Sequence, residues 1–265
     1  MKIRRVPLFV VLSVAALLLL AGCEITPIDP SLSAGALTTV ANDTYGLAVA
    51  GTTITASAPS TNTSGNTRIT FYKKADPTGE DMQSCATWSN TNNGSEQEGA
   101  ALRNLTYISG SDAWTTSITV TKNIWLNNFA VFNVHTWDTS TPDKAQQIAS
   151  FDLTSTFGTN GLGKAFPWRL CARVVGSVVT FIVWPTNETQ PAWTDSTHGG
   201  SVTLPAGSPT TGAAGLYVGH ITPGTTVAFS NPVVTKLPAG GSATATSGYE
   251  PTMPPVAPHP IPNLP

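Results

Sequence analysis

Short segments that favour β-strands recur along the middle of the chain, and this pattern constrains the fold more than any other feature of the sequence. They are rich in Val, Ile, Thr and aromatic residues, and clusters of Gly, Asn, Asp and Pro separate them. No long segment has a helical period, and the one short amphipathic stretch, Asp143 to Ile148, is expected to be a turn that leads into a strand. We therefore expect an all-β protein, a two-sheet antiparallel sandwich. The predicted strands are Thr53 to Ala56, Arg68 to Tyr72, Cys85 to Trp88, Ala100 to Tyr107, Trp114 to Val120, Phe129 to Trp137, Gln147 to Leu153, Arg169 to Val175, Val178 to Trp184, Gly215 to His220 and Thr225 to Val234.

The clearest hairpin lies between Arg169 and Trp184. Its first strand alternates Leu, Ala and Val with Arg and Cys, and Gly176-Ser177 supplies a two-residue turn between antiparallel strands. The second strand begins at Val178 and is apolar on both faces. We therefore expect it to be an inner strand of its sheet.

The first 22 residues have the layout of a secretory signal peptide. Basic residues precede an apolar run from Val6 to Leu20, which is shorter than the roughly 20 residues that a membrane-spanning helix needs. The next residues, Leu20-Ala21-Gly22-Cys23, resemble the lipobox of bacterial lipoproteins. This resemblance implies a lipid on Cys23, whose two or three acyl chains would hold the protein on the extracytoplasmic side of a membrane in the cell envelope. The alternative is an ordinary signal peptide followed by a coincidental cysteine.

Segments of low complexity flank the predicted domain. Residues 23–40 are rich in Pro, Ser, Thr and Ala, so we expect a disordered tether. Residues 238–265 contain a series of prolines, which cannot supply sheet hydrogen bonds, so we expect a disordered tail. A partner-binding peptide is the alternative for this tail. Residues 41–237 show no linker, and we expect them to form a single β-sandwich domain.

The charge of the mature chain argues against nucleic acid as a partner. Removal of the leader would leave ten Lys and Arg against fifteen Asp and Glu. A sparsely charged, mildly acidic chain does not attract a polyanion. Its abundant Thr, Ser, Asn and Gly are typical of a β-rich extracellular surface.

Two cysteines, Cys85 and Cys171, remain after the leader. An even pair without metal-ligand spacing in an oxidising compartment predicts a disulfide. Closing so long a loop would stabilise the fold by up to roughly 4 to 5 kcal/mol. A redox or zinc role is not expected, because the sequence has no CxxC motif and no histidine beside either cysteine.

Three stretches resemble the concanavalin A-like lectin and glucanase sandwich, a jelly roll that also includes laminin-G-type domains. They are the hairpin that ends in Trp184-Pro185, the glycine-flanked strand Gly212 to His220, and the closing strand Thr225 to Val234, which should return beside the first strand. The resemblance implies a jelly-roll fold. The glucanase branch of the family carries acidic residues in an E-x-D-x-E run, which this sequence lacks, so the resemblance does not extend to hydrolysis.

Few carboxylates are candidates for catalysis. Glycoside hydrolysis needs two of them facing each other across the substrate. Glu96 and Glu98 would share a strand face if the chain around them is extended, and Asp152 lies in a predicted strand. The alternative for Glu96 and Glu98 is a solvated loop, because they follow the turn sequence Asn92-Asn93-Gly94.

The segment from Phe129 to Trp137 is the best candidate for ligand binding. Alternation puts Asn133, His135 and Trp137 on one face, and an amide, an imidazole and an indole together suit a sugar, with Arg173 or Thr180 adjoining them. The alternative is that Trp137 packs between the sheets and His135 lies on a polar surface. Trp125 and Trp193 are candidates for an exposed binding rim.

An acidic loop could hold a cation. Asp76, Glu80 and Asp81 surround Pro77 and Gly79, and their oxygens suit Ca²⁺. An ordinary turn explains the same residues without a metal. No other cofactor is expected.

These observations support a non-catalytic lipoprotein, attached to the membrane through its lipid, whose β-sandwich binds a polysaccharide or a surface protein. A glycoside hydrolase or polysaccharide lyase that uses Glu96, Glu98 or Asp152 is one alternative. A structural spacer or adhesin that contacts another protein is the other.

Overall fold

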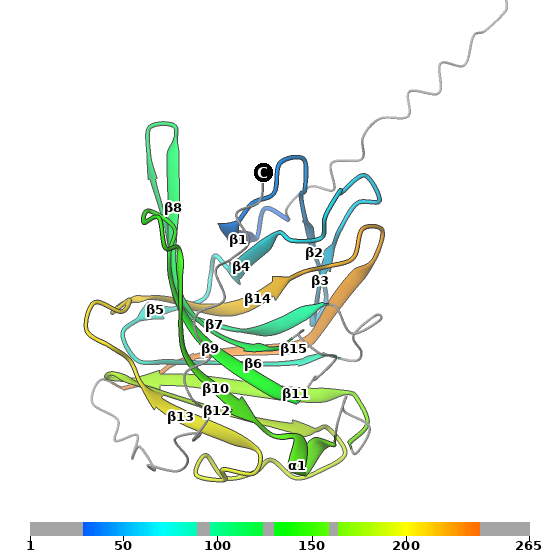
Figure 1. Cartoon of the computed structure of the whole chain (residues 1–265), viewed down its shortest axis with the longest axis vertical. Coiled ribbons are helices and arrows are strands. Elements are labelled where there is room, and N and C mark those ends of the chain that lie inside the picture. Colours follow the sequence, from blue (N-terminus) through cyan, green and yellow to red (C-terminus); the bar gives the residue numbers. More distant parts are fainter. Residues whose placement is uncertain (1–28, 89–95, 124–129, 159–163, 239–265) are drawn as a thin grey trace, which may run out of the picture.

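A computed structural model describes residues 29–88, 96–123, 130–158 and 164–238 (Figure 1). These residues form two antiparallel sheets that pack face to face, together with one short helix, α1 (Thr154–Phe157). None of the helices in the described part of the chain is both long enough and apolar enough to span a bilayer.

The eight-stranded sheet contains a meander of long neighbouring strands. Its order is β1-β4-β14-β7-β8-β9-β10, and the short β5 pairs with β14. The strands are β1 (Leu32–Thr38), β4 (Arg68–Lys73), β5 (Thr78–Gly79), β7 (Gln97–Ser109), β8 (Asp112–Lys122), β9 (Val131–Asp138), β10 (Ala145–Asp152) and β14 (Gly212–Gly219).

The seven-stranded sheet covers one face of the first. Its order is β13-β12-β11-β6-β15-β3-β2. The strands are β2 (Gly46–Ala50), β3 (Thr53–Ser57), β6 (Met82–Trp88), β11 (Trp168–Val175), β12 (Val178–Pro185), β13 (Gly199–Thr203) and β15 (Thr226–Lys236).

The predicted fold class, an all-β two-sheet antiparallel sandwich, is confirmed. The strand order also agrees with several predictions made from the residue pattern and from the resemblance to concanavalin A-like domains. The closing strand β15 pairs with β3, the first strand predicted from the sequence. The predicted hairpin joins β11 to β12 through Gly176-Ser177, and β12 is an inner strand between β11 and β13.

The core lies between the two sheets and follows from alternation along their strands. Phe132 and Val134 on β9 face Phe181 and Val183 on β12, and the rings of Phe132 and Phe181 are 5.5 Å apart. Apolar side chains at every second position of both sheets are buried in this layer, which is the main source of stability in a sandwich.

One domain boundary predicted from the sequence is wrong. The predicted tether, residues 23–40, includes β1, so the described domain begins at Asp29 rather than at residue 41. Two of the few large apolar residues in this stretch, Leu32 and Leu37, are buried. The other strands that the pattern missed are β2, β5 and β13. In β13 a Cβ atom on Gly199 would lie 1.9 Å from the carbonyl oxygen of Phe181, so this close pairing requires glycine.

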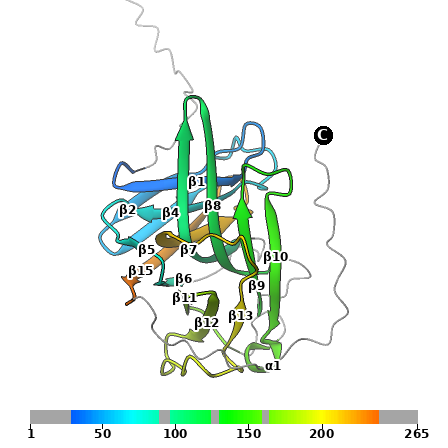
Figure 2. The same cartoon turned by 90° about the vertical axis from the view of Figure 1, so that its left-hand side faces the viewer.

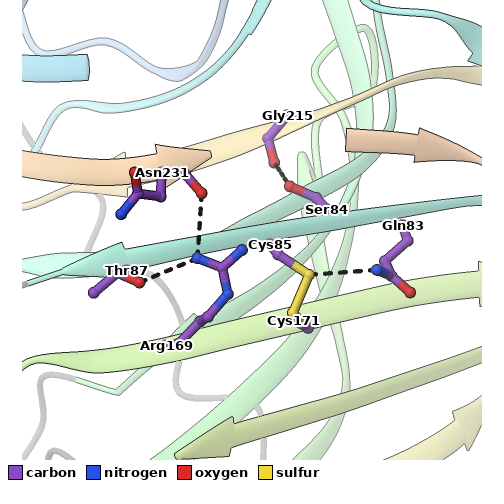
Figure 3. The surroundings of a disulfide bond; sticks show 8 residues. All are labelled: Gln83, Ser84, Cys85, Thr87, Arg169, Cys171, Gly215 and Asn231. Carbon is purple, nitrogen blue, oxygen red and sulfur yellow. Dashed lines mark hydrogen bonds between the residues drawn. A yellow bond between two sulfur atoms is a disulfide. The ribbon is translucent and has the colours of Figure 1, made fainter. Parts of the chain in front are cut away.

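The predicted disulfide between Cys85 and Cys171 is confirmed. It joins directly opposite residues of β6 and β11, on the face of the seven-stranded sheet that points away from the core (Figure 3). The bond therefore links two strands of one sheet and does not cross between the layers. A buried hydrogen bond from Ser84 Oγ to the carbonyl oxygen of Gly215, 2.6 Å long, does connect the two sheets.

Candidate binding face

The eight-stranded sheet is strongly curled, and its outer face, which points away from the core, is concave. β1 is four strands away from β8 in the sheet order, yet the two come into contact. A Cβ atom on Gly35 of β1 would lie 2.5 Å from Thr115 Oγ1 of β8 and 2.6 Å from Thr106 Oγ1 of β7. Only a sheet that bends back on itself brings its edge strand over its middle strands.

Asn133, His135 and Trp137 lie on this concave face, as alternation predicts, while the alternate residues Phe132 and Val134 face the core. On β8 their direct neighbours are Thr121, Thr119 and Ser117 respectively. The face thus presents hydroxyl, amide and imidazole groups side by side.

Trp137 has a different role from the one predicted. Its side chain is 5% exposed and clusters with Leu37 of β1 and Tyr217 of β14. Its indole nitrogen donates a hydrogen bond to Thr119 Oγ1 at 2.9 Å. Trp137 therefore neither stacks on a ligand from the surface nor packs between the sheets; it supports the curl of one sheet from within.

Two polar atoms on the concave face lack partners. Asn133 Oδ1 and His135 Nδ1 are buried and accept or donate no hydrogen bond among the described residues. Burial, with a smaller effect of the nearby Arg68 charge, lowers the pKa of His135 to about 4. The imidazole is therefore neutral at pH 7, with one nitrogen that donates and one that accepts.

Neighbouring strands continue the polar surface. The hydroxyl of Tyr217 donates to Gln97 Oε1 at 2.6 Å, and Gln97 Nε2 donates to Thr121 Oγ1 at 3.2 Å. Burial raises the pKa of Tyr217, so the phenol stays protonated. We call Arg68, Gln97, Thr121, Asn133, His135 and Tyr217 the polar row; they come from β4, β7, β8, β9 and β14. Sequence reasoning missed Arg68, Gln97, Thr121 and Tyr217, because only the sheet order brings β4, β14, β7 and β8 into one face with β9.

Arg173 and Thr180 do not adjoin this face, contrary to prediction. They lie opposite each other on β11 and β12, in the other sheet. The guanidinium of Arg173 stacks on the ring of Trp193 at 4.2 Å, and Trp193 in turn packs against the cluster around the disulfide. Trp193 is therefore part of a separate surface, and Trp125 lies outside the described residues.

Two of the candidate catalytic carboxylates, Glu96 and Glu98, both interact with the buried Lys122, whereas Asp152 lies apart from them. Glu96 and Glu98 are fully buried, so the solvated-loop alternative is wrong as well. Glu98 lies at a core-facing position of β7, 3.4 Å from Lys122 Nζ. Asp152 lies on β10, three strands away or about 14 Å, and accepts hydrogen bonds from the amide and hydroxyl of Thr154. That separation exceeds the spacing used by retaining or inverting glycosidases.

The carboxylates of the acidic loop take part in separate interactions. Among the described residues, no group of three His, Cys, Asp or Glu is arranged to hold a metal ion. Asp81 accepts a hydrogen bond from the amide of Gly176 at 2.8 Å and lies 3.8 Å from Arg103. Asp76 accepts one from the amide of Lys73, as in an ordinary turn.

Comparisons with known proteins find similarity in structure alone. No family model matches the sequence, and no curated protein is found as a relative. The exoplasmic domain of VIP36 with Ca²⁺ and Man3GlcNAc bound has a TM-score of 0.47 at 9% identity, covering 81% of this chain and 87% of that one. A legume lectin-like domain from Entamoeba histolytica has a TM-score of 0.44 at 8% identity, covering 78% and 91%. Structural similarity of this degree says nothing about the ligand or the activity of this protein.

Proposed function

We propose that this protein is a lipoprotein, anchored outside the cytoplasm through Cys23, and that its β-sandwich binds a glycan without chemical turnover. The concave face of the eight-stranded sheet is the binding surface, and the hydrogen-bonding side chains of the polar row determine which glycan it binds. This proposal depends on two atoms, Asn133 Oδ1 and His135 Nδ1, which are buried without partners among the described residues.

Unpaired buried polar atoms are costly, and a ligand can remove the cost. Each one destabilises a fold by about 1–3 kcal/mol. A sugar hydroxyl both donates and accepts, so hydroxyls that reach Asn133 and His135 after the side chains covering these two atoms move aside would satisfy both atoms. The amide and phenol of Gln97 and Tyr217 extend the same kind of chemistry along the row. None of these groups is an ionised carboxylate, which supports binding rather than hydrolysis.

Glycan binding is tested with the full chain in detergent, by calorimetric titration with a panel of cell-wall polysaccharides. We expect Asn133→Ala and His135→Ala each to weaken binding roughly tenfold, the equivalent of one lost hydrogen bond. Ser201→Ala is the matched control, because Ser201 bonds Thr180 on the other sheet. Absence of binding to every polysaccharide, or equal binding by all variants, would refute the proposal. Capture of an envelope protein through this face would instead support the adhesin alternative.

Lipidation is tested separately by mass spectrometry of the mature N-terminal peptide. We expect diacylglycerol on Cys23, and we expect Cys23→Ala to leave the protein without acyl chains and outside the membrane fraction. An unacylated mature N-terminus would support the ordinary signal peptide.

A further inference from the structure

The β7–β8 hairpin projects beyond the sandwich, at the end of the molecule opposite α1 (Figures 1 and 2). Near its tip Tyr107 pairs with Trp114 and Ile108 pairs with Ala113. The rings of Tyr107 and Trp114 stack 5.2 Å apart at 12°. Ile108 is 78% exposed and Tyr107 is 40% exposed. Tyr107 and Ile108 are two of the three large apolar side chains that are exposed in the described chain, and they lie on opposite faces of the hairpin. Exposed apolar side chains gathered at one tip are typical of an interaction site.

The hairpin is held firmly at its base. Gly35 of β1 packs against Thr106 and Thr115, one on each strand just below the aromatic pair. The hydroxyls of these two threonines are 3.1 Å apart and form a hydrogen bond. The apolar tip is therefore presented on a rigid support.

The chain that leads to the proposed lipid reaches this same region. Asp29 is fixed to the fold, since its amide donates to the carbonyl oxygen of Leu47 and its carboxylate accepts from the amide of Ser31. Cys23 and Asp29 are six positions apart in the chain, and Asp29 and Gly35 are also six positions apart. Each interval can span at most about 20 Å. The acyl chains would thus hold a bilayer within about 40 Å of the base of the hairpin.

Charges of both signs lie at the start of β1, where Asp76 accepts a hydrogen bond from the amide of Lys73 and Asp29 contacts Ser31. Lys73 pairs with Leu32 at the start of β1, and Lys74 beside it is exposed and donates its amide to the carbonyl oxygen of Ser31. The charges balance here, so contact with a membrane would depend on the apolar tip and on the lipid.

We infer that the tip of the β7–β8 hairpin inserts into the interfacial layer of the membrane that holds the lipid. The inference rests on the proposed acylation of Cys23 and is independent of glycan binding. Tyr and Trp side chains, such as those of Tyr107 and Trp114, concentrate at the headgroup level of bilayers. Ile108 adds an exposed aliphatic side chain one residue closer to the turn of the hairpin. Two attachments, one lipid and one protein, fix the orientation of the domain and direct its α1 end away from the membrane.

The experiment uses the lipidated full chain in vesicles of phosphatidylethanolamine and phosphatidylglycerol. An environment-sensitive dye is attached to Ile108→Cys, or to Ser196→Cys as the matched control. Ser196 is exposed and two residues from His198, whose ring contacts Phe157 of α1. Cys85 and Cys171 are bonded to each other and do not compete for the dye.

We expect the dye at position 108 to shift its emission to shorter wavelength and to be quenched by bromolipids, and the dye at position 196 to respond only to a water-soluble quencher. Ile108→Asp should also lose the bromolipid quenching of tryptophan fluorescence while its polysaccharide binding is unchanged. If both dyes report an aqueous environment although mass spectrometry finds acyl chains on Cys23, insertion of the hairpin is refuted and the lipid anchor is supported. If no acyl chains are found, the anchor fails and the inference with it. Protection of position 108 by an added polysaccharide or protein, rather than by lipid, would also overturn it.

Discussion

Arg103 shows how one side chain can hold several loops in place. It sits at a bulge in β7 with φ of 49°, a conformation uncommon for a bulky residue. Its guanidinium donates to the carbonyl oxygens of Glu80, Pro209 and Gly176 at 2.7, 2.9 and 2.6 Å. These carbonyls belong to three separate turns, and the arginine adds to the β5–β14 and β6–β11 pairings that bring the turns together.

We predict that Arg103→Lys destabilises the fold by about 2–4 kcal/mol, because an ammonium cannot reach three carbonyls in the planar arrangement of a guanidinium. Urea denaturation measures the loss. Arg169→Lys is the matched control: Arg169 donates to Thr87 Oγ1 and to the carbonyl oxygen of Asn231, both at 3.2 Å (Figure 3), and the loss should be smaller. Equal effects of the two substitutions would contradict a special role for Arg103.

At the residue scale, side-chain alternation and the number of cysteines predicted the features that do not depend on how the strands are arranged. The shared face of Asn133, His135 and Trp137 follows from alternation, and the pairing of Cys85 with Cys171 follows from their number. The position of Arg173 could not be predicted in this way, because alternation does not say which sheet a strand joins. The burial of Trp137 depends on Leu37, a residue one hundred positions earlier in the chain.

At the element scale, β1 is the strand that sequence reasoning missed and that the binding face most depends on. It closes the curl of the eight-stranded sheet and places Leu37 against Trp137 and Tyr217. Small residues such as Gly35 look like tether sequence, yet here they allow β1 to approach β7 and β8 closely. Composition alone therefore could not distinguish this strand from a linker.

We predict that Leu37→Ala lowers the free energy of unfolding by about 2–4 kcal/mol, the usual cost of a cavity at a buried leucine. It should also expose Trp137, which near-ultraviolet circular dichroism and acrylamide quenching would detect. Ala36→Ser is the matched control, because Ala36 is the neighbouring exposed residue of the same strand. A tether would tolerate both substitutions equally.

The disulfide acts on the unfolded chain more than on the geometry of the sandwich. β6 and β11 pair along seven residues of each strand whether or not the sulfurs are joined. We predict that the double variant Cys85→Ala/Cys171→Ala folds to the same structure but loses up to roughly 4–5 kcal/mol of stability, because the bond closes a loop of 86 residues. Urea denaturation with matching circular dichroism spectra checks both parts. An altered native spectrum would show that the bond is needed to pair the strands.

At the scale of the whole molecule, buried ionisable groups make stability depend on pH in two opposing ways. Burial lowers the pKa of His135 to about 4 and that of His220 to about 3. Burial, opposed by the charge of Lys122, raises the pKa of Glu98 to about 7. The histidines contribute stability that is present above their unfolded pKa of about 6.5 and is lost as pH falls. Glu98 contributes stability that is present below its unfolded pKa of about 4.3 and is lost as pH rises through 7.

The two contributions can be separated by removing the histidines. Between pH 6.5 and 4.5 the unfolded chain takes up protons at both histidines, whereas the folded chain does not, and each such proton changes stability by up to about 1.4 kcal/mol per pH unit. We therefore predict that the variant His135→Gln/His220→Asn gains stability relative to the wild type as pH falls over this range. Asparagine suits position 220, where φ is 57°. Urea denaturation at pH 6.5, 5.5 and 4.5 measures the difference. Because Glu98 is present in both proteins, its opposite effect cancels in the comparison, and parallel pH profiles would show that the two histidines are protonated equally in the folded and unfolded chains.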